Sequence, residues 1–362
     1  MEALVLFANA YSEAIDLLKE LIKIPSSSGR EDAATQFLQS KLKLYFPQSR
    51  MDRKGNNLVV ESIGETDGPT LLLCSHLDTV EALDSWTYDP FGAQQVGDKL
   101  YGLGSNDAGA SLVSLIAAMR LIGKPKAGRI ILALVAEEEV GSQGFYTIEP
   151  SLPRYDAAIF GEPTNLKMAT SMRGAMRLKL RSRGIGCHAS VPWEGDNATD
   201  KFVQDIQALR AIDLKDDSPW GGSTIEPTLI NGGRTANQIP DLIETTLDVR
   251  TTPKKNNEWI LRSIQDADME IEVLFNRRKP MFNDPQSKIV KAFQKHYPSL
   301  DECVFDGTCD MAFATAPSII LGPGELKVAH VADEYTELLA IKEAISVYKS
   351  VIETYLSDCG ES

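Results

Sequence analysis

The sequence predicts an α/β protein with a mostly parallel sheet and flanking helices. First, four short runs are apolar at nearly every position, which is typical of strands buried on both faces of a parallel sheet. These runs cover residues 71–76, 129–136, 157–160 and 318–321. Second, segments with the apolar spacing of amphipathic helices lie between the runs. Third, polar residues follow the runs, and open α/β sheets bind ligands outside the carboxyl ends of their strands.

The other elements of this first domain follow in chain order. A helix is expected over residues 11–24, with Ser12 as a possible N-cap, and a second helix over 31–45. A short strand at 57–62 and a turn at 64–68 lead into the first apolar run. A loop of small residues at 102–110 opens a helix that stops near Lys124. Two further helices are expected over 287–296 and 334–355.

The pattern changes between residues 168 and 281. Strands are expected at 172–183, 243–251 and 269–275, and helices at 196–209 and 258–266. The order βα, ββ, αβ resembles a small α+β domain of the ferredoxin-like type, inserted into the first domain. The expected domains are therefore 1–167 with 282–362, and 168–281.

Bulk composition limits the functional class. A chain of 362 residues is long for a single hydrophobic core, so two domains are expected. A net charge of −14 argues against a nucleic-acid or anionic-membrane partner. No apolar run approaches the ~20 residues that span a bilayer. The first residues, Met1 onward, lack the basic region of a secretory signal. Five cysteines without a CxxC pair suit free thiols in a reducing cytosol, so a cytoplasmic location is expected.

The first apolar run ends in His76 and Asp78, which leave an extended segment on the same side. A neutral imidazole is a good zinc ligand, and a nearby carboxylate can hold its other N–H. Taken alone, the pair is more often a hydrogen-bonded histidine at a strand end.

The rest of the chain supplies a fuller set of two imidazoles and five carboxylates: His76, Asp78, Asp107, Glu137, Glu138, Glu162 and His330. This inventory suits two divalent ions about 3.5–4 Å apart with one acid bridging them. Nitrogen and oxygen ligands without thiolates favour zinc, with cobalt or manganese as substitutes. The alternative for residues 137–139 is a solvated acidic run, although such a run rarely follows a buried strand directly.

Other classes of protein fit less well. The loop at 102–110 fails the dinucleotide pattern G-x-G-x-x-G because Asp107 stands where the third glycine should be. The sequence has no G-x-S-x-G elbow, which disfavours a serine hydrolase. A non-catalytic binding protein on the same fold is the alternative from another class.

The order and spacing of the motifs resemble the M20 metallopeptidase/amidohydrolase family over nearly the whole chain. The motifs are His76-x-Asp78, Asp107 in a glycine loop, the pair Glu137-Glu138, the segment Gly161-Glu162-Pro163-Thr164 and the late His330. The resemblance implies a zinc-peptidase fold with two Zn²⁺ per subunit. It places His76 and Glu162 on one zinc, Glu138 and His330 on the other, and Asp107 between them. It makes Asp78 the residue that orients His76, and Glu137 the general base.

The segment 168–281 resembles the family's lid or dimerisation domain. Residues 184–190 resemble a motif whose histidine, here His188, reaches the active site of the neighbouring subunit, which implies a homodimer. An ordinary surface histidine is the alternative. Asn237 and Arg250 match positions that bind polar groups of the substrate, and Arg173 is a candidate for a substrate carboxylate. An arginine on a strand is more often solvated or ion-paired.

The resemblance implies hydrolysis of the Nα-acyl amide of an amino acid, a small-molecule substrate. Many members carry Asp-x-Lys-Gly, whereas this chain has Asp107-Ala108-Gly109-Ala110. This variant loop and residues 329–335 look most like the branch that acts on N-acetyl- or N-succinyl-ornithine in arginine biosynthesis. The alternatives within the family are succinyl-diaminopimelate desuccinylase and an M20 dipeptidase or carboxypeptidase.

Overall fold

A computed structural model describes residues 2–267, 269–298 and 303–357. The chain forms two compact units, Met1–Ser171 with Asn283–Ser362, and Met172–Phe282. These limits lie within four residues of the expected domain boundaries at 168 and 281. Cys359 and Met1, used above to argue for free thiols and against a secretory signal, lie outside the described residues.

A mixed sheet forms the centre of the first unit, in the strand order β1-β2-β6-β3-β7-β15-β8, with β14 pairing with β8. Its strands are β1 (Arg50–Lys54), β2 (Asn57–Ile63), β3 (Thr66–His76), β6 (Ala127–Val135), β7 (Ala157–Phe160), β8 (Ala169–Met172), β14 (Cys303–Phe305) and β15 (Ser318–Ile320). A small second sheet has the order β16-β5-β4, from β4 (Gln94–Val96), β5 (Lys99–Tyr101) and β16 (Tyr335–Glu337).

The four apolar runs become four adjacent parallel strands, β6, β3, β7 and β15. In the register, His76 pairs with Val135, Cys74 with Phe160, and Phe160 with Ile320. The carboxyl ends of the strands therefore lie close to level, and the residues that follow them meet at one edge of the sheet. The predicted α/β fold is confirmed.

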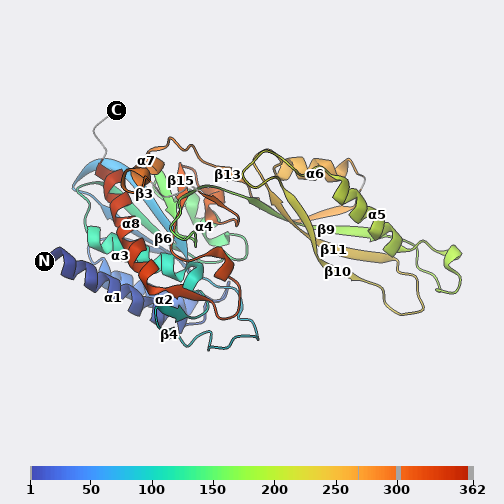
Figure 1. Cartoon of the computed structure of the whole chain (residues 1–362), viewed down its shortest axis with the longest axis horizontal. Coiled ribbons are helices and arrows are strands. Elements are labelled where there is room, and N and C mark those ends of the chain that lie inside the picture. The colour runs from blue at the N-terminus through green and yellow to red at the C-terminus, as the bar shows by residue number, and fades with distance from the viewer. Residues whose placement is uncertain (1, 268, 299–302, 358–362) are drawn as a thin grey trace. The chain divides into compact units, whose positions relative to one another are not determined.

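Helices cover both faces of the sheet and bury its apolar side chains (Figure 1). Helices α1 (Glu2–Ile22), α3 (Ala110–Ile122) and α8 (Leu338–Ser357) pack against one another, and α8 also contacts β3 and β6. Helix α4 (Gln143–Ile148) covers the opposite face, where the rings of Phe145 and Phe160 meet edge to face with centroids 5.4 Å apart. Helix α2 (Asp32–Tyr45) contacts β2, and α7 (Lys288–His296) packs on α8.

Three boundaries differ from the sequence prediction. Helix α1 begins at Glu2, so Ser12 lies inside the helix and is not its N-cap. The expected turn at 64–68 is partly the start of β3, because Gly64 and Thr66 donate to the carbonyls of Gly128 and Lys126. The last helix begins at Leu338 because residues 335–337 pair with β5.

The second unit is a four-stranded antiparallel sheet with two helices. Its strands follow the order β10-β11-β9-β12, formed by β9 (Gly174–Arg183), β10 (Thr224–Gly232), β11 (Leu242–Thr251) and β12 (Ile271–Arg278). Asn197 caps helix α5 (Ala198–Ala211) and Asn256 caps α6 (Asn257–Gln265), and each asparagine side chain accepts a backbone N–H of the first turn. The chain order β9-α5-β10-β11-α6-β12 in this sheet is the predicted ferredoxin-like arrangement. Strand β13 (Met281–Phe282) ends the unit.

Alternate residues of β11 are buried, which places one face of this sheet against the helices. The remaining short helical segments among the described residues are Ser105–Gly109, which carries Asp107, and Glu149–Ser151, Pro192–Glu194, Asp310–Phe313 and Leu326–Val328.

Candidate metal centre

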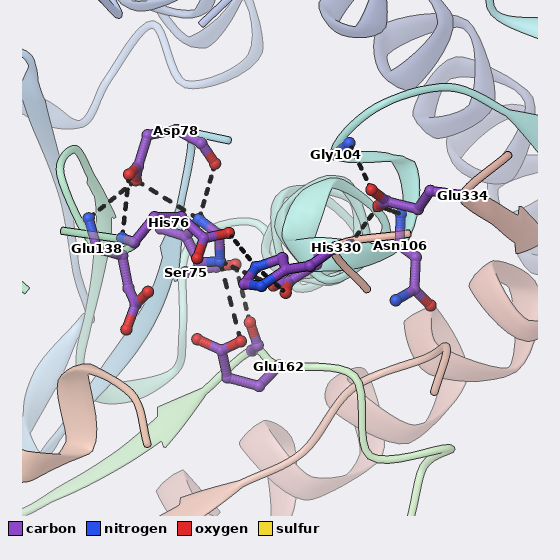
Figure 2. A network of polar contacts seen from close by, with 12 residues as sticks. Ser75, His76, Asp78, Gly104, Asn106, Glu138, Glu162, His330 and Glu334 are labelled. Carbon is purple, nitrogen blue, oxygen red and sulfur yellow. Dashed lines mark hydrogen bonds and ion pairs between the residues drawn. The ribbon is translucent and has the colours of Figure 1, made fainter. Parts of the chain in front are cut away.

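His76, the last residue of β3, presents one ring nitrogen to a cluster of carboxylates (Figure 2). Its side chain is buried, with Nδ1 3.0 Å from the backbone carbonyl oxygen of Asp78. Because Nδ1–H donates to that carbonyl, the lone pair of the neutral ring lies on Nε2. Nε2 is 3.1 Å from Oδ1 of Asp107 and 3.9 Å from Oε2 of Glu162. One ring nitrogen is thus fixed by the backbone and the other is available to a metal ion.

The first group of potential ligands comprises His76, Asp107 and Glu162, whose ligand atoms all lie within 4.8 Å of one another. All three residues are buried. Burial raises the pKa of Glu162 well above its usual range, and the charge of Asp107 adds to this effect although His76 opposes it. Burial lowers the pKa of His76, but hydrogen bonds to Asp107 and Asp78 outweigh burial and raise it well above normal.

A second group within the same distance limit comprises Asp107, Glu139 and His330. Nε2 of His330 is 2.9 Å from Oε1 of Glu139 and 3.4 Å from Oδ2 of Asp107. The hydrogen bond to Glu139 raises the pKa of His330 to about 9, and the charge of Asp107 contributes. Burial and the charge of Asp107 raise the pKa of Glu139.

Asp107 belongs to both groups and lies between the two imidazoles, with one carboxylate oxygen toward each ring. It is part of the loop 102–109, and the peptide bond between Asp107 and Ala108 is cis. A shared acid between two sets of ligands is the arrangement of a two-metal site.

The residues fit divalent ions on chemical grounds. The carboxylates of Asp107, Glu139 and Glu162 belong to the two adjoining groups, and burial opposes the ionisation of Glu139 and Glu162. A divalent cation would remove this repulsion and would make ionisation favourable. Carboxylate oxygen with imidazole nitrogen is also a donor set that zinc accepts.

The acidic run after β6 presents Glu139, not Glu138, to the second group. Glu138 was expected beside His330, and the structure does not place it in either group. The reason is the backbone at Glu137, which has a φ of 55° and turns the chain directly after β6. His330 also has a left-handed φ of 59°.

Glu138 is nonetheless a buried part of the site. Its charge acts on Glu162 of the first group, and Ser142 Oγ lies 3.4 Å from its Oε1. Glu137, expected as the general base, is half-buried, and its backbone N–H donates to Oε1 of Glu31 at 3.3 Å. The structure therefore offers Glu138 as the buried carboxylate that no ligand group includes.

Asp78 contacts His76 mainly through its backbone carbonyl, because its carboxylate Oδ1 is 3.5 Å from Nδ1. The carboxylate instead accepts the backbone N–H groups of Glu138 and Glu139 and the hydroxyl of Ser28. Burial raises the pKa of Asp78, but His76 and these donors outweigh burial and lower it.

Two acids that support the site were not singled out in the sequence. Glu31 is fully buried and accepts the N–H groups of Gly29 and Glu137, and Glu334 accepts those of the loop that carries Asp107. Burial and then the charge of Asp107 raise the pKa of Glu334 to about 8. A single acid between two elements has no distinctive pattern in a sequence.

Comparison with known proteins identifies the family. The model of peptidase family M20/M25/M40 matches residues 72–354, which is more than half of the chain.

The chain belongs to this family.

A relative named probable succinyl-diaminopimelate desuccinylase, from Staphylococcus aureus, is 26% identical over 402 residues and is aligned over 96% of this chain and 98% of its own. An M20 family metallo-carboxypeptidase from Sulfolobus solfataricus has the same fold, with a TM-score of 0.80 at 18% identity over 95% of this chain and 99% of the other. A dinuclear metal-binding M20 peptidase from Bacillus subtilis has a TM-score of 0.73 and is 16% identical. The match covers 97% of this chain and 99% of the other. The expected membership of the M20 family is confirmed, and with it a metal-dependent hydrolase.

The remaining candidate residues of this M20 protein lie in the second unit. His188 and Asn237 are both exposed, and their segments lie side by side because the N–H of Ala189 donates to the carbonyl of Asn237. Nδ1 of His188 lies 2.8 Å from Oγ of Ser190. Their roles stay predictions.

The two arginines expected to bind substrate, Arg173 and Arg250, both have protein partners. Arg173 donates to the backbone carbonyls of Gly222 and Trp220, and Arg250 pairs with Asp248 at 2.7 Å. A substrate-binding role for either guanidinium also stays a prediction. Among the described residues, no helix is both long enough and apolar enough to span a membrane.

Proposed function

We propose that this M20 protein hydrolyses the amide bond of a small acylated amino acid or short peptide at a centre of two zinc ions. The observation that carries the proposal is the position of Asp107 between two imidazoles, each with its own glutamate. Each group offers one imidazole nitrogen and carboxylate oxygens, and the groups share a single acid. That pattern suits two ions better than one.

The ligand assignment differs from the sequence expectation at one position. His76 and Glu162 would hold one ion, Glu139 and His330 the other, and Asp107 would bridge. Glu139 takes the place expected for Glu138 because it is the residue within reach of His330. When bound, the two ions would supply Lewis acidity that activates water at neutral pH and polarises the amide carbonyl.

The general base is then Glu138 instead of Glu137. Its carboxylate is buried close enough to Glu162 for its charge to act on that ligand but belongs to neither group, which suits a residue that handles protons. Its backbone is fixed by Asp78, so the carboxylate has a defined position relative to the ligands. Glu138 would take a proton from the attacking water and later deliver it to the nitrogen of the leaving amine.

The substrate is best sought among succinylated diamino acids and short peptides. The Staphylococcus aureus relative is named as a probable succinyl-diaminopimelate desuccinylase, and the Sulfolobus solfataricus structure is named as a carboxypeptidase. These names favour the alternatives stated above over N-acetyl- or N-succinyl-ornithine, which the variant loop at 107–110 had favoured. We therefore rank N-succinyl-diaminopimelate and peptides before acylornithines.

A homodimer is the proposed assembly, with the unit Met172–Phe282 as the dimerisation domain. Strand β10 forms an edge of its sheet and exposes Leu229 and Ile230. Trp193 and Ile185, near His188 in the chain, are also exposed. Large apolar side chains on an open edge are typical of a surface that a partner covers.

The experiment is a side-by-side rate measurement with zinc-loaded protein. The substrates are N-succinyl-diaminopimelate, a dipeptide series, N-acetylornithine and N-succinylornithine, with Glu138→Gln as the inactive control. We expect kcat/KM to be greatest for the succinylated diamino acid or a dipeptide. The absence of amide hydrolysis on every substrate would contradict the proposed function, and a preference for acylornithine would overturn only the ranking of substrates.

A further inference from the structure

Glu334 is a fully buried carboxylate that receives three backbone N–H groups from one loop (Figure 2). Its Oε1 lies 2.8 Å from the backbone nitrogen of Asn106 and 3.0 Å from the backbone nitrogen of Asp107. Its Oε2 lies 3.2 Å from the nitrogen of Gly104. The loop that carries the shared acid Asp107 is therefore held by a side chain from the opposite end of the sequence.

The backbone around Glu334 makes the same connection. Its carbonyl accepts the N–H of Gly102, and the next residue, Tyr335, pairs with Tyr101. Four residues earlier in the chain stands His330, whose ring lies 3.4 Å from Oδ2 of Asp107. The segment 330–335 thus contacts the loop 102–107 through the imidazole of His330 and through both the carbonyl and the carboxylate of Glu334.

We propose that Glu334 is a positioning residue that sets Asp107 relative to both imidazoles. The inference rests on the proposed two-metal function, because it assigns Glu334 an effect on both ions. An acid shared by two ions must direct one oxygen to each, so a small rotation of its backbone would disturb both sites together. Loss of Glu139 or Glu162 would instead disturb one site more than the other.

The physical basis is the cost of leaving buried donors without acceptors. Asn106 and Asp107 of this loop are buried, and a buried N–H that loses its acceptor is destabilising because it no longer has water or protein to bind. The loop would move to find other acceptors, and Asp107 would move with it. A carboxylate that supports a ligand in this manner typically changes metal affinity 10–100-fold when it is replaced.

The test compares Glu334→Gln with Asp333→Asn in the full-length protein. The glutamine keeps one acceptor oxygen, but its amide nitrogen cannot accept the N–H of Gly104. Asp333 is a matched control because its carboxylate accepts two backbone N–H groups, from Thr87 and Tyr88, in a different loop. Its φ of 58° also suits asparagine.

Two measurements are made on each variant. Hydrogen exchange of the metal-free protein reports the Asn106 and Asp107 amides, and titration with Zn²⁺ or Co²⁺ against a chelator reports both binding steps. We expect faster exchange at these amides in E334Q, and affinities for both ions that are lower by roughly 10–100-fold, with D333N close to wild type. If E334Q does not fold, Glu334→Asp, which keeps the carboxylate but shortens its reach, carries the same comparison.

Unchanged exchange and unchanged affinities in a folded variant would overturn the role of Glu334, as would an equal loss in D333N. A wild-type protein that fails to bind two ions would instead overturn the proposed function. The two failures are therefore distinguishable.

Discussion

The side chain of Asp78 accepts a hydrogen bond from the backbone N–H of Glu138, with 3.0 Å between Oδ1 and nitrogen. Its other oxygen accepts the N–H of Glu139 at 3.1 Å. Because Asp78 also follows His76 and accepts its Nδ1–H through the backbone carbonyl, one residue fixes ligands at the ends of both β3 and β6. The geometry of the site depends on this residue although it belongs to neither ligand group.

Replacing Asp78 by asparagine should weaken the site as a whole. The amide can accept one of the two backbone N–H groups, so the segment 138–139 would lose part of its support. We expect zinc affinity to fall roughly 10–100-fold, with kcat reduced as well. Competition with a chelator measures the zinc affinity, and initial rates measure kcat. Asp156→Asn is the control, since Asp156 accepts the N–H of Thr70 at the other end of β3. Equal losses in the two variants would argue against the special position of Asp78.

Glutamine variants of Glu137 and Glu138 separate the two candidates for the general base. Glu138→Gln should lower kcat by about 10²–10⁴-fold while both metal ions stay bound, because the amide cannot accept the proton. Glu137→Gln should have a much smaller effect. Metal content by mass spectrometry and kcat under saturating substrate measure the outcome. The reverse ranking would restore the original assignment to Glu137.

The variant Glu139→Gln should remove one ion and not both. Its side chain belongs only to the group with Asp107 and His330, and an amide is a poorer metal ligand than a carboxylate. The expected stoichiometry in a zinc titration is therefore one tight and one weakened site. Glu137→Gln serves as the neighbouring control and should retain two tight sites. Two tight sites in the Glu139 variant would exclude it as a ligand.

Mixed dimers test whether His188 acts across subunits. Neither Glu138→Gln nor His188→Ala should be active alone. Every site of the first variant lacks the proposed base, and every site of the second lacks the histidine that the neighbouring subunit would supply. Co-expression should restore roughly a quarter of the wild-type activity, because random pairing leaves one complete site in half of the dimers. Activity is measured after light scattering has established the oligomeric state. No recovery in a verified mixed dimer would place His188 outside the neighbouring site.

The fold and the location of the site could be predicted because both leave strong patterns. Four mainly apolar runs predicted four neighbouring parallel strands, and residues such as His76 and Glu162 at their ends were expected to meet at one edge. The insert could be predicted as a ferredoxin-like unit from the order of its strands and helices. In its strand β10, the apolar residues Leu229 and Ile230 are exposed. The strand therefore lacks the regular alternation of buried apolar and exposed polar residues that would mark its limits in the sequence.

The register of the site could not be predicted in the same way. Three consecutive glutamates are chemically identical, so only the left-handed backbone at Glu137 decides which of them points to His330. Glu334 was expected at the start of the last helix, which in the structure begins at Leu338. Its actual role depends on a contact with Asp107, more than two hundred residues earlier in the chain. Such tertiary contacts leave no periodicity in the sequence.

The most direct test of the central claim is a crystal structure of zinc-loaded protein with anomalous data collected at the zinc edge. The account predicts two anomalous peaks about 3.5–4 Å apart, one on each side of Asp107, with Glu139 beside the peak at His330. A single peak would contradict a two-metal centre, and the absence of any peak between His76 and His330 would contradict the metal centre itself.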